Sequence, residues 1–159
     1  MAGDDIKHLK IYFDGGSRGN PGPSAVGAVV LDDRGNRLEE MSAYIGKYTN
    51  NMAEYLALDK ILDIAEKYKS KKIILFTDSK LLCNQIKKTW KIKDENILKI
   101  YLKVSQKLGR YDLVDLRLIP REQNKEADRL VNKALDKKDL TYEGESKISF
   151  GNIDDQSPY

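Results

Sequence analysis

The 159-residue sequence contains one cysteine, Cys83, and one histidine, His8. A single cysteine excludes a disulfide within the chain and a cysteine-rich zinc site. A single histidine close to the N-terminus leaves no set of histidines to bind a metal and no evident histidine base. Acid–base or metal chemistry in this protein is therefore expected to depend on carboxylates.

Long apolar runs are also missing. No stretch approaches the roughly 20 apolar residues of a membrane-spanning helix, and the first residues hold no apolar signal region. We therefore expect a cytoplasmic protein without a membrane partner, and a monomer. Hydrophobic residues make up 40% of the chain and charged residues 33%, a balance typical of a folded domain rather than a disordered one.

The net charge of +3 hides an uneven distribution. Residues 60–110 hold 14 Lys and Arg against 5 Asp and Glu, a local balance of +9, so the remainder of the chain sums to −6. A basic segment of this kind can follow the phosphates of a nucleic acid. Because lysines on solvated helix faces give the same pattern, charge alone does not identify a nucleic-acid partner.

The spacing of apolar residues predicts a mixture of strands and helices. Strands are expected at residues 8–14, 25–31, 37–45, 72–77 and 113–119, and helices at 51–67, 79–90, 94–108 and 123–136. Short turns between the first three strands indicate an antiparallel meander. The order predicts one α/β domain over residues 1–136, followed by a tail, 137–159, that is either packed or disordered.

Three local features accompany this pattern. The stretch 15–23 is rich in glycine and proline and is expected to be irregular. The continuous apolar run 73–76 is typical of a strand covered on both faces at the centre of a sheet. Cys83 and Trp90 are both expected to lie in the core.

Four carboxylates occupy positions where a solvated side chain is not expected. Asp14 ends the first strand and Asp78 ends the apolar fourth strand. Glu54 and Asp128 lie toward the apolar faces of the first and last helices, because each precedes apolar residues at helical spacing. A cluster of four such groups would repel itself strongly unless it were protonated or neutralised by cations.

Each of these acids also has a plainer explanation. Asp14 and Asp78 fit turn or capping positions. Glu54 fits the first turn of a helix, and Asp128 can pair with a neighbouring base such as Arg121. One shared site accounts for all four at once, and oxygen ligands alone suit Mg²⁺, with Mn²⁺ as a substitute. Two such ions about 3.5–4 Å apart are the usual apparatus of phosphodiester hydrolysis.

Four segments together resemble type 1 ribonuclease H: residues 11–23 (IYFDGGSRGNPGP), 49–55 (TNNMAEY), 76–79 (FTDS) and 124–128 (NKEAD). Their order and spacing agree with that family over about residues 7–136. The resemblance implies a five-stranded mixed sheet in the order 3-2-1-4-5 with helices on both faces. It also implies hydrolysis of the RNA strand of RNA–DNA hybrids, leaving 5′-phosphate and 3′-hydroxyl ends.

The same resemblance implies roles for the four acids. Asp14, Glu54, Asp78 and Asp128 would hold two Mg²⁺ ions, one activating the attacking water and the other stabilising the leaving 3′ oxygen. Asp14 would bridge both ions, and Asp128 would be the most loosely engaged.

Substrate contacts are implied as well. Asn20, Asn50 and Asn51 match positions that reach into the minor groove of the hybrid, and Thr49 matches a position that binds a DNA phosphate. Ser17 matches the region that reads RNA 2′-hydroxyls. Asn50 and Asn51 also fit a turn and a helix N-cap, and both interpretations can hold at once.

Some residues depart from the family pattern. Residues 119–123 lack the histidine that many members carry, and only 87–93 remains of a basic handle, which resembles a histidine-less branch. Arg121 either takes over part of the histidine's role or merely pairs with an acid. The alternatives to a ribonuclease are a catalytically silent nucleic-acid-binding module on the same fold, and a related nuclease that acts on DNA or also cuts double-stranded RNA.

Overall fold

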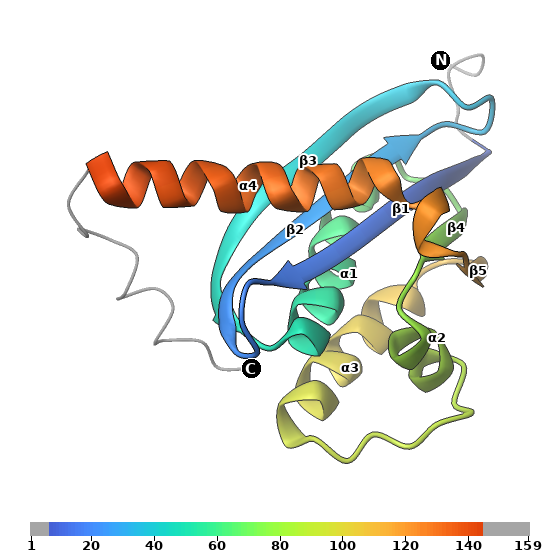
Figure 1. Ribbon diagram of the computed structural model, residues 1–159. Coiled ribbons are helices and arrows are strands. Elements are labelled where there is room, and N and C mark those ends of the chain that lie inside the picture. The colour runs from blue at the N-terminus through green and yellow to red at the C-terminus, as the bar shows by residue number, and fades with distance from the viewer. Residues whose placement is uncertain (1–6, 145–159) are drawn as a thin grey trace.

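Five strands form one mixed sheet in the order β3-β2-β1-β4-β5 in the computed structural model, of which residues 7–144 are described (Figure 1). The strands are β1 (His8–Ser17), β2 (Gly22–Leu31), β3 (Arg37–Tyr48), β4 (Lys72–Thr77) and β5 (Leu113–Leu118). The first three are antiparallel, whereas β4 runs parallel to β1 and β5 runs parallel to β4. The predicted α/β class and strand order are confirmed.

Helices cover both faces of this sheet (Figure 1). They are α1 (Asn50–Glu66), α2 (Lys80–Ile86), α3 (Glu95–Leu108) and α4 (Lys125–Gly144), with a 3-10 turn, η2 (Arg121–Gln123), before the last helix. The main core lies between the sheet and the helix pair α1 and α3, and includes Leu9, Ile11, Phe13, Leu58, Ile61, Ile73, Leu75, Ile100 and Val104. A smaller cluster of Ala25, Val131, Ala134 and Leu135 lies under α4 on the other face.

The glycine-rich stretch after Asp14 differs from the prediction. Gly15 and Gly16 continue β1 and pair with β2, so regular structure extends to Ser17. A Cβ atom on Gly15 would lie 2.1 Å from the carbonyl oxygen of Ala53 in α1. Glycine is needed here because β1 and α1 approach closely, and not because the chain turns.

The second helix ends earlier than its pattern suggests. It stops at Ile86, and Lys88 follows with a φ of 65°, a left-handed conformation that interrupts a helix. Trp90 therefore lies in the connection to α3, where its side chain is 44% exposed, and the prediction that it is a core residue is wrong. Cys83 is buried, as predicted.

The last helix is longer than predicted. It continues past residue 136 to Gly144, and Figure 1 shows its C-terminal end projecting beyond the sheet. A helix that leaves the sheet needs no apolar face, so the loss of periodicity after residue 136 did not mark its end. The remainder of the predicted tail, 145–159, lies outside the described residues.

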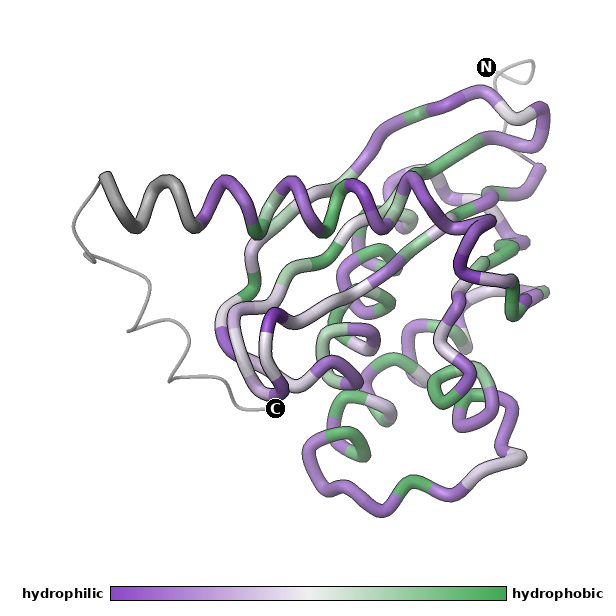
Figure 2. Tube along the Cα trace, in the orientation of Figure 1, coloured by the Kyte–Doolittle hydropathy of each residue, from purple (hydrophilic) through white to green (hydrophobic). Residues whose placement is uncertain are grey.

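Hydrophilic residues recur along α4, with apolar ones between them (Figure 2). Within residues 7–144 no helix combines the length and the apolar character that crossing a membrane requires.

Candidate active site

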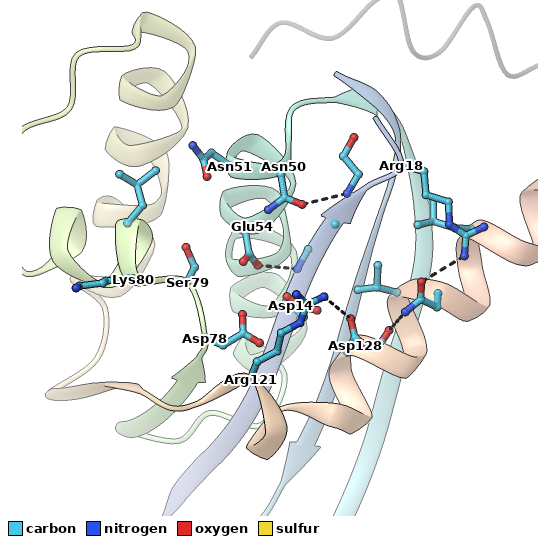
Figure 3. Close-up of a pocket in the computed structure, with 17 residues that line it drawn as sticks. Asp14, Arg18, Asn50, Asn51, Glu54, Asp78, Ser79, Lys80, Arg121 and Asp128 are labelled. Carbon is cyan, nitrogen blue, oxygen red and sulfur yellow. Dashed lines mark hydrogen bonds and ion pairs between the residues drawn. The ribbon is translucent and has the colours of Figure 1, made fainter. Parts of the chain in front are cut away.

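Three carboxylates from three elements meet at one end of the central strands. Asp14 lies near the end of β1, Asp78 directly follows β4, and Glu54 comes from α1. One carboxylate oxygen of each lies within 4.8 Å of the others, and Figure 3 shows the three side chains around a common space. The parallel pairing of β1 with β4 runs as far as Tyr12 and Phe76, which brings the two aspartates together as predicted.

Glu54 is held by the backbone of β1. Its helix begins after Thr49, whose side chain accepts a hydrogen bond from the N–H of Met52 at 3.2 Å. Glu54 is 5% exposed, and its Oε1 accepts a hydrogen bond from the N–H of Gly15 at 2.7 Å. The close approach that Gly15 permits therefore also fixes the carboxylate.

Asp78 is half-buried and lies in the short turn between β4 and α2. The Thr77 hydroxyl accepts the N–H of Ser79 at 3.0 Å, and the Ser79 hydroxyl accepts the N–H of Leu82 to cap α2. The carboxylate itself accepts a hydrogen bond at 3.3 Å from Nδ2 of Asn124.

No salt bridge among the described residues neutralises the three acids. Burial, followed by repulsion from Asp78, raises the pKa of Asp14 to about 7. Burial and then the charge of Asp14 raise the pKa of Glu54 well above its usual range. Burial also raises the pKa of Asp78, although the Asn124 hydrogen bond and Arg121 lower it. Among the described residues no salt bridge reaches any of the three acids, so full ionisation requires an added cation.

This donor set fits a hard divalent cation. It offers only carboxylate oxygens, which Mg²⁺ and Mn²⁺ prefer, and no imidazole or thiolate. A divalent charge at the centre of the cluster would favour the ionised form of each acid and offset their mutual repulsion.

Asp128 lies at the edge of this group rather than within it. It stands in the first turn of α4 and lines the same cleft, but it is not one of the three acids that converge. Its Oδ1 is 3.9 Å from Nη2 of Arg121, whose side chain is 81% exposed. The pairing of Asp128 with Arg121 is therefore long and open to solvent.

The acids line a cleft of about 440 Å³. Of the residues predicted to contact substrate, Ser17, Asn50 and Asn51 also line it, whereas Asn20 and Thr49 do not. Asn20 instead accepts the N–H of Asn50 at 3.0 Å, and Asn50 accepts the N–H of Ser17 at 3.3 Å. Thr49 is the N-cap of α1, so the prediction that Asn50 or Asn51 caps the helix is wrong.

Several cleft residues were not predicted to belong to the site: Arg18, Lys80, Val131, Asn132 and Leu135. Arg18 extends from the β1–β2 turn toward α4 (Figure 3). Its Nη2 lies 2.6 Å from Oδ1 of Asp136 and 3.3 Å from Oδ1 of Asn132. Lys80 directly follows Asp78 and Ser79 and belongs to the basic segment 60–110, so its position in the sequence could have indicated a place in the site. Arg18 gave no comparable signal, because its partners are far away in the sequence.

Known proteins are similar in sequence to this chain. The family model described as "Reverse transcriptase-like" matches residues 12–134. A bifunctional protein of Mycobacterium tuberculosis is 41% identical over 127 residues, which cover 79% of this chain and 35% of that protein. Ribonuclease HI of Halobacterium salinarum is 39% identical over 125 residues, covering 79% of this chain and 63% of that protein. The chain thus spans about a third of the first relative and less than two thirds of the second.

Solved structures agree with these matches. The crystal structure of RNase H1 from Halobacterium salinarum has a TM-score of 0.79 at 38% identity, covering 82% of this chain and 98% of that one. LC11-RNase H1, isolated from compost, was solved in complex with an RNA/DNA hybrid. That structure has a TM-score of 0.78 at 38% identity, with the same two coverages.

Proposed function

Because the chain belongs to the ribonuclease H family, we propose that it hydrolyses the RNA strand of RNA–DNA hybrids. The reaction depends on two Mg²⁺ ions, for which Mn²⁺ can substitute, and leaves 5′-phosphate and 3′-hydroxyl ends. We assign the ions to Asp14, Glu54, Asp78 and Asp128. A similar protein was solved with an RNA/DNA hybrid, which supports this choice of substrate.

One observation carries the proposal. Asp14, Glu54 and Asp78 bring carboxylate oxygens within 4.8 Å of one another. Bound divalent ions would supply the missing positive charge, activate a water for attack and stabilise the leaving oxygen. The protein orients its ligands in advance, through the Gly15 N–H to Glu54 and the Asn124 amide to Asp78.

The looser placement of Asp128 fits a secondary role. It lies at the cleft wall with Arg121 at 3.9 Å, outside the three acids that converge. We assign the protein to a branch that lacks the histidine and the basic handle of many members, because residues 119–123 contain no histidine. Arg121, at the mouth of the cleft, is our candidate for part of that histidine's role.

Three of the five residues that we assign to substrate binding line the same cleft. Ser17, Asn50 and Asn51 line it and suit the wide, shallow minor groove of a hybrid, which displays 2′-hydroxyls. Asn20 acts through Asn50, whose N–H it binds, and Thr49 is assigned to a DNA-strand phosphate at the start of α1. Activity on double-stranded RNA, the monomeric state and the cytoplasmic location stay predictions.

A cleavage assay tests the proposal. The purified protein is incubated with Mg²⁺ and an end-labelled RNA–DNA hybrid, beside double-stranded RNA and double-stranded DNA. We expect cleavage of the RNA strand of the hybrid, and a fall in kcat of more than about 10³-fold in Asp78→Asn, equivalent to about 4 kcal/mol of transition-state stabilisation. Asp63→Asn, a matched change on the exposed side of α1, should cleave at the wild-type rate.

The outcomes separate the alternatives. Hybrid binding without cleavage would support a catalytically silent module. Undiminished cleavage by Asp78→Asn would reject the assigned metal site, and preferential cutting of either duplex control would assign the protein to another nuclease class.

A further inference from the structure

Asn124 is a buried amide behind the acid cluster. It lies between η2 and α4, is 1% exposed and does not line the cleft. Its Nδ2 donates one hydrogen bond to the carbonyl oxygen of Phe13 at 2.9 Å and one to Oδ2 of Asp78 at 3.3 Å. Both protons of the amide are therefore directed at the strands that carry Asp14 and Asp78.

The orientation of this amide is dictated by its neighbours. Phe13 O and Asp78 Oδ2 both accept hydrogen bonds, so only the NH₂ group can face them. The Asn124 Oδ1 is left buried, and within the described part of the chain it is the one buried side-chain oxygen or nitrogen without a hydrogen-bond partner. A buried unpaired acceptor costs free energy. The buried, unpaired Oδ1 is the consequence of directing both N–H groups toward Phe13 and Asp78.

Asn124 lies where the two central strands separate. The pairing of β1 with β4 ends at Tyr12 and Phe76, so no backbone ladder fixes the distance between the segments that follow. The Asn124 amide spans them, from Phe13 beside Asp14 to the Asp78 side chain. The backbone carbonyl oxygen of Asn124 accepts a hydrogen bond from the backbone N–H of Asp128 at 3.1 Å. Asn124 is therefore hydrogen-bonded to Asp78, to Asp128 and to Phe13, the neighbour of Asp14.

Asp14 and Glu54 are held in place without Asn124, whereas Asp78 is not. Glu54 is fixed by the N–H of Gly15, and Asp14 lies within the paired part of β1 and β2. Asp78 follows the end of its strand, and Asn124 is the hydrogen-bond partner that its carboxylate has among the described residues. We propose that Asn124 is a positioning residue that holds Asp78 in the orientation needed to bind a divalent cation. This inference rests on the proposed function.

The test compares two buried amides. Asn124→Leu removes both donors and keeps the number and branching of the side-chain heavy atoms. Gln85→Leu is the control, because Gln85 is also buried (6% exposed) and hydrogen-bonded, to Tyr55 at 2.7 Å, but lies outside the cleft. Mn²⁺ binding is measured by isothermal titration calorimetry without substrate, and melting temperature, kcat and KM are measured alongside.

We expect Asn124→Leu to weaken Mn²⁺ binding by about 10–100-fold, the usual effect of losing a hydrogen bond that orients a ligand. Its kcat should fall at fixed Mn²⁺ and recover as Mn²⁺ is raised, with KM for the hybrid unchanged because Asn124 does not reach the cleft. Gln85→Leu should lower the melting temperature and leave Mn²⁺ affinity at the wild-type value.

Wild-type Mn²⁺ affinity in a folded Asn124→Leu protein would overturn the positioning role, and so would an equal loss of affinity in Gln85→Leu. If Asn124→Leu does not fold, Asn124→Ala, which adds no apolar bulk beside Asp78, is measured in the same way. A wild-type protein that neither binds Mn²⁺ nor cleaves the hybrid rejects the proposed function itself. If the wild type binds Mn²⁺ and cleaves the hybrid, and the Asn124 variants bind Mn²⁺ equally well, only the positioning role is rejected.

Discussion

Helix α1 carries two buried carboxylates with opposite surroundings. Asp59 is 5% exposed, and its two oxygens lie 2.6 Å from Nζ of Lys107 and 3.7 Å from Nζ of Lys103, both in α3. Glu54 is equally buried, yet it faces Asp14 and has no salt bridge among the described residues. The fold supplies its own cations to Asp59 and leaves the group around Glu54 short of positive charge.

The difference separates an acid that stabilises the fold from an acid that we assign to a metal site. The cation beside Asp59 is the side chain of Lys107, so this ion pair links α1 to α3. Burial tends to lower the pKa of Lys107, but hydrogen bonds to Asp59 and Asp63 raise it above its ordinary value, and the lysine stays charged. At Glu54 a cation would have to come from solution, and under the proposed function the bound ion would itself ligate a substrate phosphate.

The largest effect is expected where the internal cation is removed. Lys107→Met leaves Asp59 buried beside the more distant Lys103, and should lower the free energy of unfolding by about 3 kcal/mol. Hybrid cleavage at a temperature where the variant is folded should be unchanged. Urea denaturation measures the loss, with the exposed Lys99→Met on the same helix as the control. A loss under about 1 kcal/mol would mean that Asp59 is adequately paired without Lys107.

A smaller effect of opposite sign is expected in the cluster. The pKa of Asp14 is about 7 in the fold and 3.8 in its ordinary state, so the folded protein holds a proton that the unfolded chain releases. Stability of the metal-free protein should therefore fall as the pH rises from about 4 to about 7. Asp14→Asn should remove the part of this dependence that Asp14 contributes, while Glu54 and Asp78 keep the raised pKa that their own burial causes. It should also raise stability at pH 8 by about 1–2 kcal/mol, while abolishing cleavage.

Urea denaturation at pH 5 and pH 8, with and without Mg²⁺, checks this prediction. Mg²⁺ should stabilise the wild type more at pH 8 than at pH 5, and Asp14→Asn little at either. The matched change Asp59→Asn should instead lower stability, since it removes the partner of Lys107. Equal pH dependence in wild type and Asp14→Asn would show that Asp14 does not contribute to the slope.

The smallest effect is expected at the mouth of the cleft. The Arg121 side chain is 81% exposed and 3.9 Å from Asp128, a geometry that contributes less than about 1 kcal/mol to stability. Arg121→Ala should leave the melting temperature unchanged and lower kcat by about two- to fivefold, which corresponds to under about 1 kcal/mol. Steady-state kinetics at saturating hybrid measures this change. Unchanged turnover would remove Arg121 from the catalytic residues.

Periodicity predicted the elements, and motif spacing predicted the residues of the site. Alternation in β1 and the apolar run in β4 gave the strands whose ends carry Asp14 and Asp78, because side-chain direction in a strand repeats every two residues. Boundaries were less accurate where packing overrides propensity. Gly15 continues a strand because α1 lies against it, and Trp90 is exposed because α2 stops at Ile86.

The sequence by itself determined the class and order of elements, the family, and which carboxylates stand at strand ends and on apolar helix faces. These are local properties, set by neighbouring residues and their spacing. Only the tertiary structure decided that Asp14, Glu54 and Asp78 converge while Asp128 stays at the edge, that Asp59 has lysine partners and Glu54 has none, and that Asn124 joins two strand ends. Distances between residues far apart in the chain depend on how whole elements pack, which no local pattern records.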